Sequence, residues 1–254
     1  IAMHNAKYDV SMLEVDGIQV GRHRVHDTML MANLVDSQGP KALKLAAGRW
    51  VDRNAGSSQK DLREGMRKAG WTFATVPETF GPYWHYAALD TVWTAKLATK
   101  LWPQVQPMRE AYDLELAVLW VLLDLEHRGA RIDVDYCKRT ARVLRGELAE
   151  VEARWPDMNL HSSNQVTAAL QAAGFELTKQ TETGKLAVDE EVLGGIDHPL
   201  ARDTLVARDL KKVCSTYLDA FVRYQIDGTL HFNVNSIGAK TGRMSISRPS
   251  MQNL

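Results

Sequence analysis

Good helix formers fill the segment Tyr83-Trp84-His85-Tyr86-Ala87-Ala88-Leu89-Asp90, and the run continues without Gly or Pro until Pro103. Residues four apart on a helix lie on one face, so we expect Tyr86 and Asp90 to present a phenol beside a carboxylate. Such a pair can hold a divalent metal ion and orient a water molecule. His85 is five residues from Asp90, about 140° away around the helix, so Tyr86 is the better placed partner. The spacing alone is equally consistent with a surface Asp beside a half-buried Tyr.

The composition fits a globular protein with one or two domains. The chain has 254 residues, 45% hydrophobic and 24% charged, and its formal net charge is zero, which gives no overall attraction to nucleic acid or membranes. Cys137 and Cys214 lie far apart and form neither a disulfide framework nor a metal-finger spacing, which favours a reducing cytoplasm. The most apolar run, Leu116 to Leu123, is too short to span a bilayer.

The first 106 residues alternate short apolar segments with helical ones, which predicts an α/β layer. We expect a strand at Ile18-Gln19-Val20 and a helix from His26 to Leu34. The segment His4-Asn5-Ala6-Lys7-Tyr8-Asp9 follows a strand end and opens a helix, so Asn5 and Asp9 share a face. Capping of that helix by Asn5 is an equally simple explanation of the pattern.

The second part of the chain is predicted to be mainly helical. Pro103 and Pro107 interrupt the pattern and mark the expected domain boundary. A long helix is then expected from Met108 to Arg128, ended by Gly129, and two further helices at residues 135–155 and from His198 onward. A strand over residues 229–235 is expected to begin a sheet.

The residues after position 199 are locally basic although the whole chain is neutral. Eight Lys and Arg oppose four Asp there, which leaves a net charge of +4. Most charge runs are solvated faces. Beside hydroxyl and amide residues such as Ser215-Thr216 and Gln252-Asn253, they also suit phosphate contacts.

Three motifs occur in a fixed order along the chain. They are His4-Asn5-Ala6-Lys7-Tyr8-Asp9, then Tyr86-Ala87-Ala88-Leu89-Asp90, then Thr241-Gly242-Arg243-Met244-Ser245 with Pro249-Ser250-Met251-Gln252-Asn253. The first two resemble the second and third exonuclease motifs of family A DNA polymerases (the bacterial DNA polymerase I family), the third motif being of the tyrosine-bearing proofreading type. The last resembles the segment that enters the polymerase palm of that family. The resemblance covers essentially the whole chain.

This resemblance implies a fold and a division into domains. Residues 1–106 would be the later part of an α/β ribonuclease H-like 3′–5′ exonuclease domain. Residues 107–228 would be a mainly α-helical thumb that grips duplex DNA, and residues 229–254 would open an α+β palm with its first strand.

The resemblance also implies roles for single residues. Asp9 and Asp90 would be metal ligands in a centre that uses two Mg²⁺ (or Mn²⁺) ions, and Tyr86 would orient the attacking water. The residues implied to contact DNA are Asn5 and Tyr8 at a frayed 3′ end, Arg243 at the primer terminus, and Ser162, Ser163, Ser215, Thr216, Thr241, Gln252 and Asn253 elsewhere on the template and primer. The implied partners are primer–template DNA and deoxynucleotides, with no membrane, and the implied state is a monomer.

Departures from the family pattern limit what the chain can do alone. The family's first exonuclease motif, Asp-x-Glu on a strand, is absent. The two Asp-Leu-Glu sequences at 113–115 and 124–126 lie in a predicted helix, where residues i and i+2 point about 200° apart. The catalytic aspartates of the palm would follow Leu254. Both chain ends look cut, so we expect an inactive internal piece of a longer polymerase.

Two alternatives remain open at this point. A stand-alone ribonuclease D-type exonuclease explains residues 1–106 and leaves residues 241–253 without a role. A non-catalytic DNA-binding module fits the isolated chain, because neither active site is complete in it.

Overall fold

The computed structural model describes residues 1–238 and 242–251. They form two compact units: the first comprises residues 1–127 and 234–245, and the second comprises the remaining described residues. Thr241, Gln252 and Asn253 lie outside the described residues. None of the described helices combines the length and the apolar character that crossing a bilayer would require.

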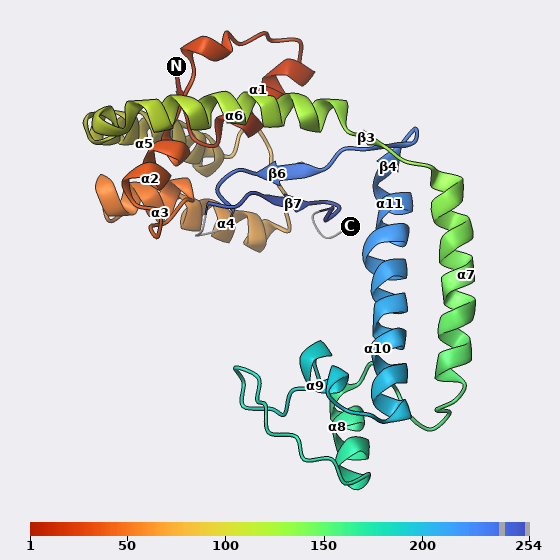
Figure 1. Cartoon of the computed structure of the whole chain (residues 1–254). Helices are drawn as coiled ribbons and strands as arrows, with labels where there is room; N and C mark the ends of the chain where they lie inside the picture. Colours follow the sequence, from red (N-terminus) through yellow and green to blue (C-terminus); the bar gives the residue numbers. More distant parts are fainter. Residues whose placement is uncertain (239–241, 252–254) are drawn as a thin grey trace. The chain divides into compact units, whose positions relative to one another are not determined.

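A long helix, α5 (Gly81–Val105), is central to the first unit. It packs against α2 (Thr28–Val35), α3 (Leu43–Trp50) and α4 (Ser57–Ala69), which Figure 1 draws below it. Buried apolar side chains of these helices and of α6 (Arg109–Arg128) form the core, among them Leu30, Met31, Ala46, Ala47, Trp93, Leu97, Leu101, Tyr112 and Leu119. The predicted helix around Tyr86 and Asp90 is confirmed, and burial of its apolar side chains holds it in place.

The sheet of the first unit is very small. β1 (Ala2–Met3) pairs in parallel with β2 (His26–Asp27), so that Ala2 lies opposite His26 and Met3 opposite Asp27. The helix α1 (Ala6–Val15) follows β1, and a 3₁₀ turn, η1 (Arg22–Arg24), precedes β2. A parallel pair with a helix between its strands agrees with the expected α/β layer.

The strand predicted at residues 18–20 is wrong. Within the described chain these residues pair with no strand. Gly17 adopts a φ of 76°, and the backbone N–H of Ile18 donates to the carbonyl of Leu13 at 2.8 Å, which caps the end of α1. The helix predicted from His26 begins at Thr28 instead, because His26 and Asp27 belong to β2.

The first compact unit extends beyond the proline pair at which the sequence predicts the domain boundary. α5 continues through Pro103, and a 3₁₀ turn, η2 (Gln106–Met108), leads into α6 without a linker. Tyr112 and Leu119 of α6 are buried in the core of the first unit. The division falls after His127, next to Gly129, whose φ of 66° ends α6 as predicted.

The second unit is built on α7 (Val134–Glu152). This helix packs along a continuous helical segment made of α10 (Pro199–Lys212), a π-helical turn η3 (Val213–Leu218) and α11 (Asp219–Tyr224). Figure 1 draws α7 in green beside this segment in blue. The two helices predicted in this part of the chain are therefore confirmed.

Shorter elements complete the second unit. α8 (Ser163–Ala172) and α9 (Glu190–Gly194) pack against α10 around a core that includes Leu160, Val166, Leu170, Leu193 and Leu200. β3 (Ala130–Arg131), β5 (Thr229–Leu230) and β4 (Gln225–Ile226) form an antiparallel sheet in that order.

The strand predicted over residues 229–235 is interrupted. β5 ends at Leu230, and β6 (Asn233–Asn235) pairs instead with β7 (Ser245–Ser247). The hairpin between β4 and β5 turns at Asp227 and Gly228, which have φ values of 49° and 75°, as a tight two-residue turn requires.

Candidate functional site

Tyr86 and Asp90 of α5 line one cavity with a volume of about 750 Å³. Both residues are half-buried, whereas the neighbouring His85 is exposed. The other walls come from α3, from α4 and from the loop between them, and include Lys44, Gly48, Arg53, Gln59 and Arg63. The four-residue spacing therefore correctly predicts that the phenol and the carboxylate face the same space.

Lys44 is the residue of this cavity that the sequence did not reveal. Its ammonium group forms an ion pair with Asp90 and lies 4.7 Å from the centroid of the Tyr86 ring. Burial lowers the pKa of Lys44. Helical spacing is the sequence signal that could have revealed Lys44. It lies three residues before Ala47, which is buried, and α3 packs against α5. A protein cation thus neutralises the carboxylate that we expected to hold a metal ion.

Asp9 lies in the first turn of α1 and is not among the residues that line this cavity. Burial and the negative charge of Asp27 raise the pKa of Asp9 to about 6. α1 follows β1 directly, and α5 packs against β1. The structure therefore places Asp9 and Asp90 on two helices that adjoin the same strand, and Asp9 lies outside the set of residues that line the cavity of Asp90.

Asp27 organises the surroundings of Asp9 and was also missed as a site residue. Its carboxylate is fully buried and accepts backbone N–H groups from two helix starts: Asn5 at 3.2 Å, Ala6 at 2.8 Å, Met29 at 2.7 Å and Leu30 at 3.4 Å. Burial raises the pKa of Asp27, and these N–H donors oppose the rise because they favour the charged form.

Asn5 occupies the position before α1, with a left-handed φ of 66°, but its side chain forms no capping hydrogen bond. Asp27 accepts the N–H groups there, so the simple capping explanation of Asn5 is wrong. Tyr8, on the first turn of α1, is 60% exposed and presents its ring to solvent. The Tyr8 side chain is therefore open to a ligand, whereas Asn5 is half-buried.

The described residues do not make a magnesium site by themselves. No group of three or more His, Cys, Asp or Glu side chains within residues 1–238 and 242–251 is arranged to hold a metal ion. Mg²⁺ requires about six oxygen ligands, and Asp9 and Asp90 supply only two carboxylates, one of them paired with Lys44. The two Asp-Leu-Glu sequences lie on α6 as expected, and Asp113 pairs there with Arg109.

The residues implied to contact DNA in the later part of the chain lie mostly at the surface. Ser163, Ser215, Thr216 and Arg243 are exposed. Ser162 is half-buried, and its hydroxyl accepts the backbone N–H of Gln165 at 3.4 Å, which caps α8. These positions leave polar atoms free for phosphate contacts, although Ser215 already donates to the carbonyl of Lys211.

Comparison with known proteins identifies the family. The sequence model described as DNA polymerase family A matches residues 134–254. DNA polymerase I of Chloroflexus aurantiacus is 31% identical over 99% of the chain, and DNA polymerase I of Synechocystis is 32% identical over 99% of it. The chain belongs to DNA polymerase family A.

This family A chain spans only part of its relatives. It covers 28% of the Chloroflexus protein, 26% of the Synechocystis protein and 46% of a DNA polymerase from Mycobacterium phage D29, to which it is 26% identical. A solved structure described as the POL domain of Pol1 from M. smegmatis in complex with DNA primer-template and dNTP has the same fold. Its TM-score is 0.77 and its identity 24%, with 98% of this chain and 42% of that chain covered.

Proposed function

We propose that the full-length protein is a DNA-directed DNA polymerase that extends primers and also excises mispaired 3′ ends. The observation that carries the proposal is that relatives named DNA polymerase I align with 99% of the chain, so that both compact units correspond to polymerase sequence. A stand-alone ribonuclease D-type exonuclease does not account for the family match over residues 134–254.

The domain assignment follows from the order of the motifs. Residues 1–106 would be the later part of a ribonuclease H-like exonuclease domain, residues 107–228 the thumb and residues 229–254 the start of the palm. Because Tyr112 and Leu119 belong to the core of the first unit, we extend the structural limit of the first domain to His127.

The excision activity is assigned to Asp9, Tyr86 and Asp90. The Tyr86 phenol would orient the attacking water, and the nearby Lys44, Arg53 and Arg63 give the cavity positive charge toward the phosphate of a DNA 3′ end. Asn5 and Tyr8 would hold the unpaired terminal nucleotides.

The family resemblance implies Mg²⁺ or Mn²⁺ in the full-length protein, with Asp9 and Asp90 as the ligands that this chain supplies. The remaining carboxylates would come from the Asp-x-Glu motif outside the chain. The isolated chain would therefore be inactive and would act only as a DNA-binding module. The full-length protein would act as a monomer on primer–template DNA and deoxynucleotides, in the cytoplasm of a bacterial or phage-infected cell.

We expect Arg243→Ala in the full-length protein to slow primer extension by about 10- to 100-fold. Loss of one hydrogen bond from a charged group costs about 1.5–3 kcal/mol, which corresponds to that change in rate. Single-nucleotide extension of a matched primer measures the effect, with Arg67→Ala, an exposed arginine of α4, as the matched control. Extension by Arg243→Ala at the unsubstituted rate would show that the assignment of this residue is wrong.

A further inference from the structure

A buried ion pair joins two helices of the first unit. The ammonium group of Lys7 on α1 donates to Oε1 of Glu126 on α6. Only 9% of the Lys7 side chain and 13% of the Glu126 side chain are exposed. Lysine and glutamate are rarely buried to this degree unless they are paired, and neither residue has a role in the reactions proposed for the protein.

The backbone of Val234 completes this cluster. The ammonium group of Lys7 also donates to the carbonyl oxygen of Val234 at 2.5 Å, and the N–H group of Val234 donates to Oε1 of Glu126 at 2.5 Å. Val234 is the middle residue of β6 and is 3% exposed, so backbone groups without partners would be costly there. The ion pair thus bonds both backbone groups of Val234, as a residue of an antiparallel neighbouring strand would.

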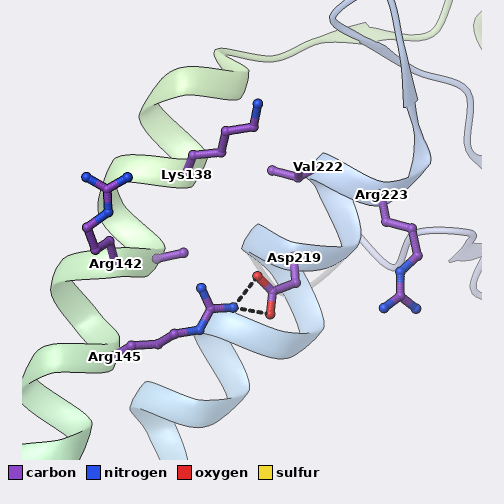
Figure 2. Close-up of a pocket in the computed structure, with 7 residues that line it drawn as sticks. Lys138, Arg142, Arg145, Asp219, Val222 and Arg223 are labelled. Atoms are coloured by element: carbon purple, nitrogen blue, oxygen red, sulfur yellow. Dashed lines mark hydrogen bonds and ion pairs between the residues drawn. The ribbon is translucent and has the colours of Figure 1, made fainter.

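The ion pair of Arg145 and Asp219 in the second unit is of a different kind. Figure 2 shows these two side chains pointing toward each other from α7 and α11, and 53% and 39% of them are exposed. Such a pair contributes little to stability. Removing one member of the buried pair, by contrast, leaves a charge without compensation and also removes a bond to Val234. The buried cluster can therefore hold a strand in place.

β6 leads to Arg243, the residue assigned to the primer terminus. Ile237, three residues after Val234, packs against the core of the first unit. A Cβ atom on Gly238 would collide with Oγ of Ser245, so the backbone at Gly238 lies close to Ser245. Arg243 is two residues before Ser245, and both belong to the first unit. The cluster that anchors β6 therefore also anchors the segment that carries Arg243.

The other side of the cluster lies in the motif assigned to excision. Lys7 is next to Tyr8 and two residues before Asp9 on α1. Asp27 accepts backbone N–H groups at the start of this helix, and Lys7 bonds the same helix to α6 and β6. One cluster thus connects the helix that carries Asp9 with the strand that leads to Arg243.

We propose that Lys7 and Glu126 are positioning residues that hold the Arg243 segment and the Asp9 helix in a fixed relation, so that extension and excision both depend on them. This inference rests on the proposed function, because it takes Arg243 and Asp9 as residues of those two reactions. Lys7 and Glu126 act through the backbone of Val234 and through α1, and not by contact with the reacting groups.

The decisive variant is the charge swap Lys7→Glu with Glu126→Lys. It keeps an ion pair between α1 and α6, but it places a carboxylate, which only accepts hydrogen bonds, beside the carbonyl of Val234. It also places an ammonium group, which only donates, beside the N–H of Val234. A simple ion pair survives the swap, whereas a cluster that includes Val234 does not. The matched control is the surface swap Glu64→Lys with Lys68→Glu, at an exposed pair of α4.

Single-turnover extension of a matched primer and excision of a mispaired primer are measured with the full-length enzyme. The amplitude of each reaction reports the fraction of active enzyme, and the rate constant reports how well the active molecules are aligned. We expect the charge swap to lower both rate constants by about 10- to 100-fold, since a displacement of about 1 Å can cost that much. The surface swap should leave both rate constants within about twofold.

Hydrogen exchange in the complete 254-residue chain tests the anchoring without any reaction. The Val234 amide should exchange at least about tenfold faster in the charge swap, as expected for loss of one hydrogen bond to a charged group. The amide of Leu97, which is buried in α5, should keep its protection and so show that the unit is folded. If Leu97 loses protection, Lys7→Met with Glu126→Gln, which leaves no buried charge unpaired, replaces the charge swap.

Each outcome decides the inference. Unchanged rate constants with reduced amplitudes would show a role in stability alone and would overturn it. So would a charge swap that behaves like the surface swap, or a loss of excision with normal extension, because the cluster would then not reach Arg243. An unsubstituted enzyme that performs neither reaction refutes the proposed function itself, and this inference with it.

Discussion

Asp90→Ala in the full-length polymerase is expected to reduce excision of a mispaired 3′ nucleotide by about a thousandfold or more, an increase of about 4 kcal/mol in the activation free energy. The carboxylate shares a cavity with Tyr86, so its loss removes both an expected metal ligand and the acidic partner of the phenol. Extension of a matched primer should stay within about twofold, since Asp90 belongs to the first unit. Single-turnover assays of both reactions on end-labelled primers measure the two rates.

The ion pair with Lys44 requires a second variant. Asp90→Ala leaves a buried ammonium group without its partner, which can destabilise the first unit. Asp90→Asn keeps an oxygen atom beside Lys44 and should lose excision to a similar extent. Asp61→Ala, an exposed aspartate of α4, should excise like the unsubstituted enzyme. Equal losses of excision and extension in both Asp90 variants would contradict a separate nuclease site.

Asp27→Ala should lower the free energy of unfolding of the first unit by about 3–5 kcal/mol. The substitution leaves four backbone N–H groups at two helix starts without their acceptor. Each buried N–H group without an acceptor costs about 1–3 kcal/mol, and the total falls when the surrounding structure shifts to satisfy some of them. Six of the seven tryptophans lie in residues 1–127, so urea unfolding followed by tryptophan fluorescence reports mainly on this unit.

Asp133→Ala is the matched control, and because Asp133 lies in the second unit, urea unfolding of both variants is also followed by far-ultraviolet circular dichroism, which reports on the helices of both units. Asp133 also caps a helix, but it is exposed and accepts a single backbone N–H, from Tyr136 at 2.7 Å. The loss of such a cap costs about 1 kcal/mol. If Asp27→Ala proves no more destabilising than Asp133→Ala, then Asp27 does not hold the starts of α1 and α2 together.

Elements that depend on local sequence were predictable. The helix that carries Tyr86 and Asp90, and the end of α6 at Gly129, follow from helix propensity and from the positive φ that glycine tolerates. The segment Ile18–Val20 was misread because a short apolar run after a glycine fits both a strand and a helix cap. Pro103 does not interrupt α5, because packing of this helix holds its last turn despite the missing N–H.

Features that depend on packing between distant elements were not predictable. Lys44 reaches Asp90 only because α3 packs on α5, and Asp27 reaches Asn5 only because β2 pairs with β1. Likewise, the ion pair between Arg145 and Asp219 forms only because α7 packs along α11. No single-sequence pattern links residues that lie 22 to 74 positions apart, as these pairs do.

The central claim is that Asp9 and Asp90 serve one nuclease centre although they lie in different surroundings. Excision of a mispaired 3′ nucleotide by the full-length enzyme carrying Asp9→Ala, Asp90→Ala or both substitutions tests this claim most directly. Because residues of one catalytic unit are not additive, we predict that the double variant is no slower than either single variant. Excision at the unsubstituted rate by Asp9→Ala, or losses that multiply in the double variant, would contradict the claim.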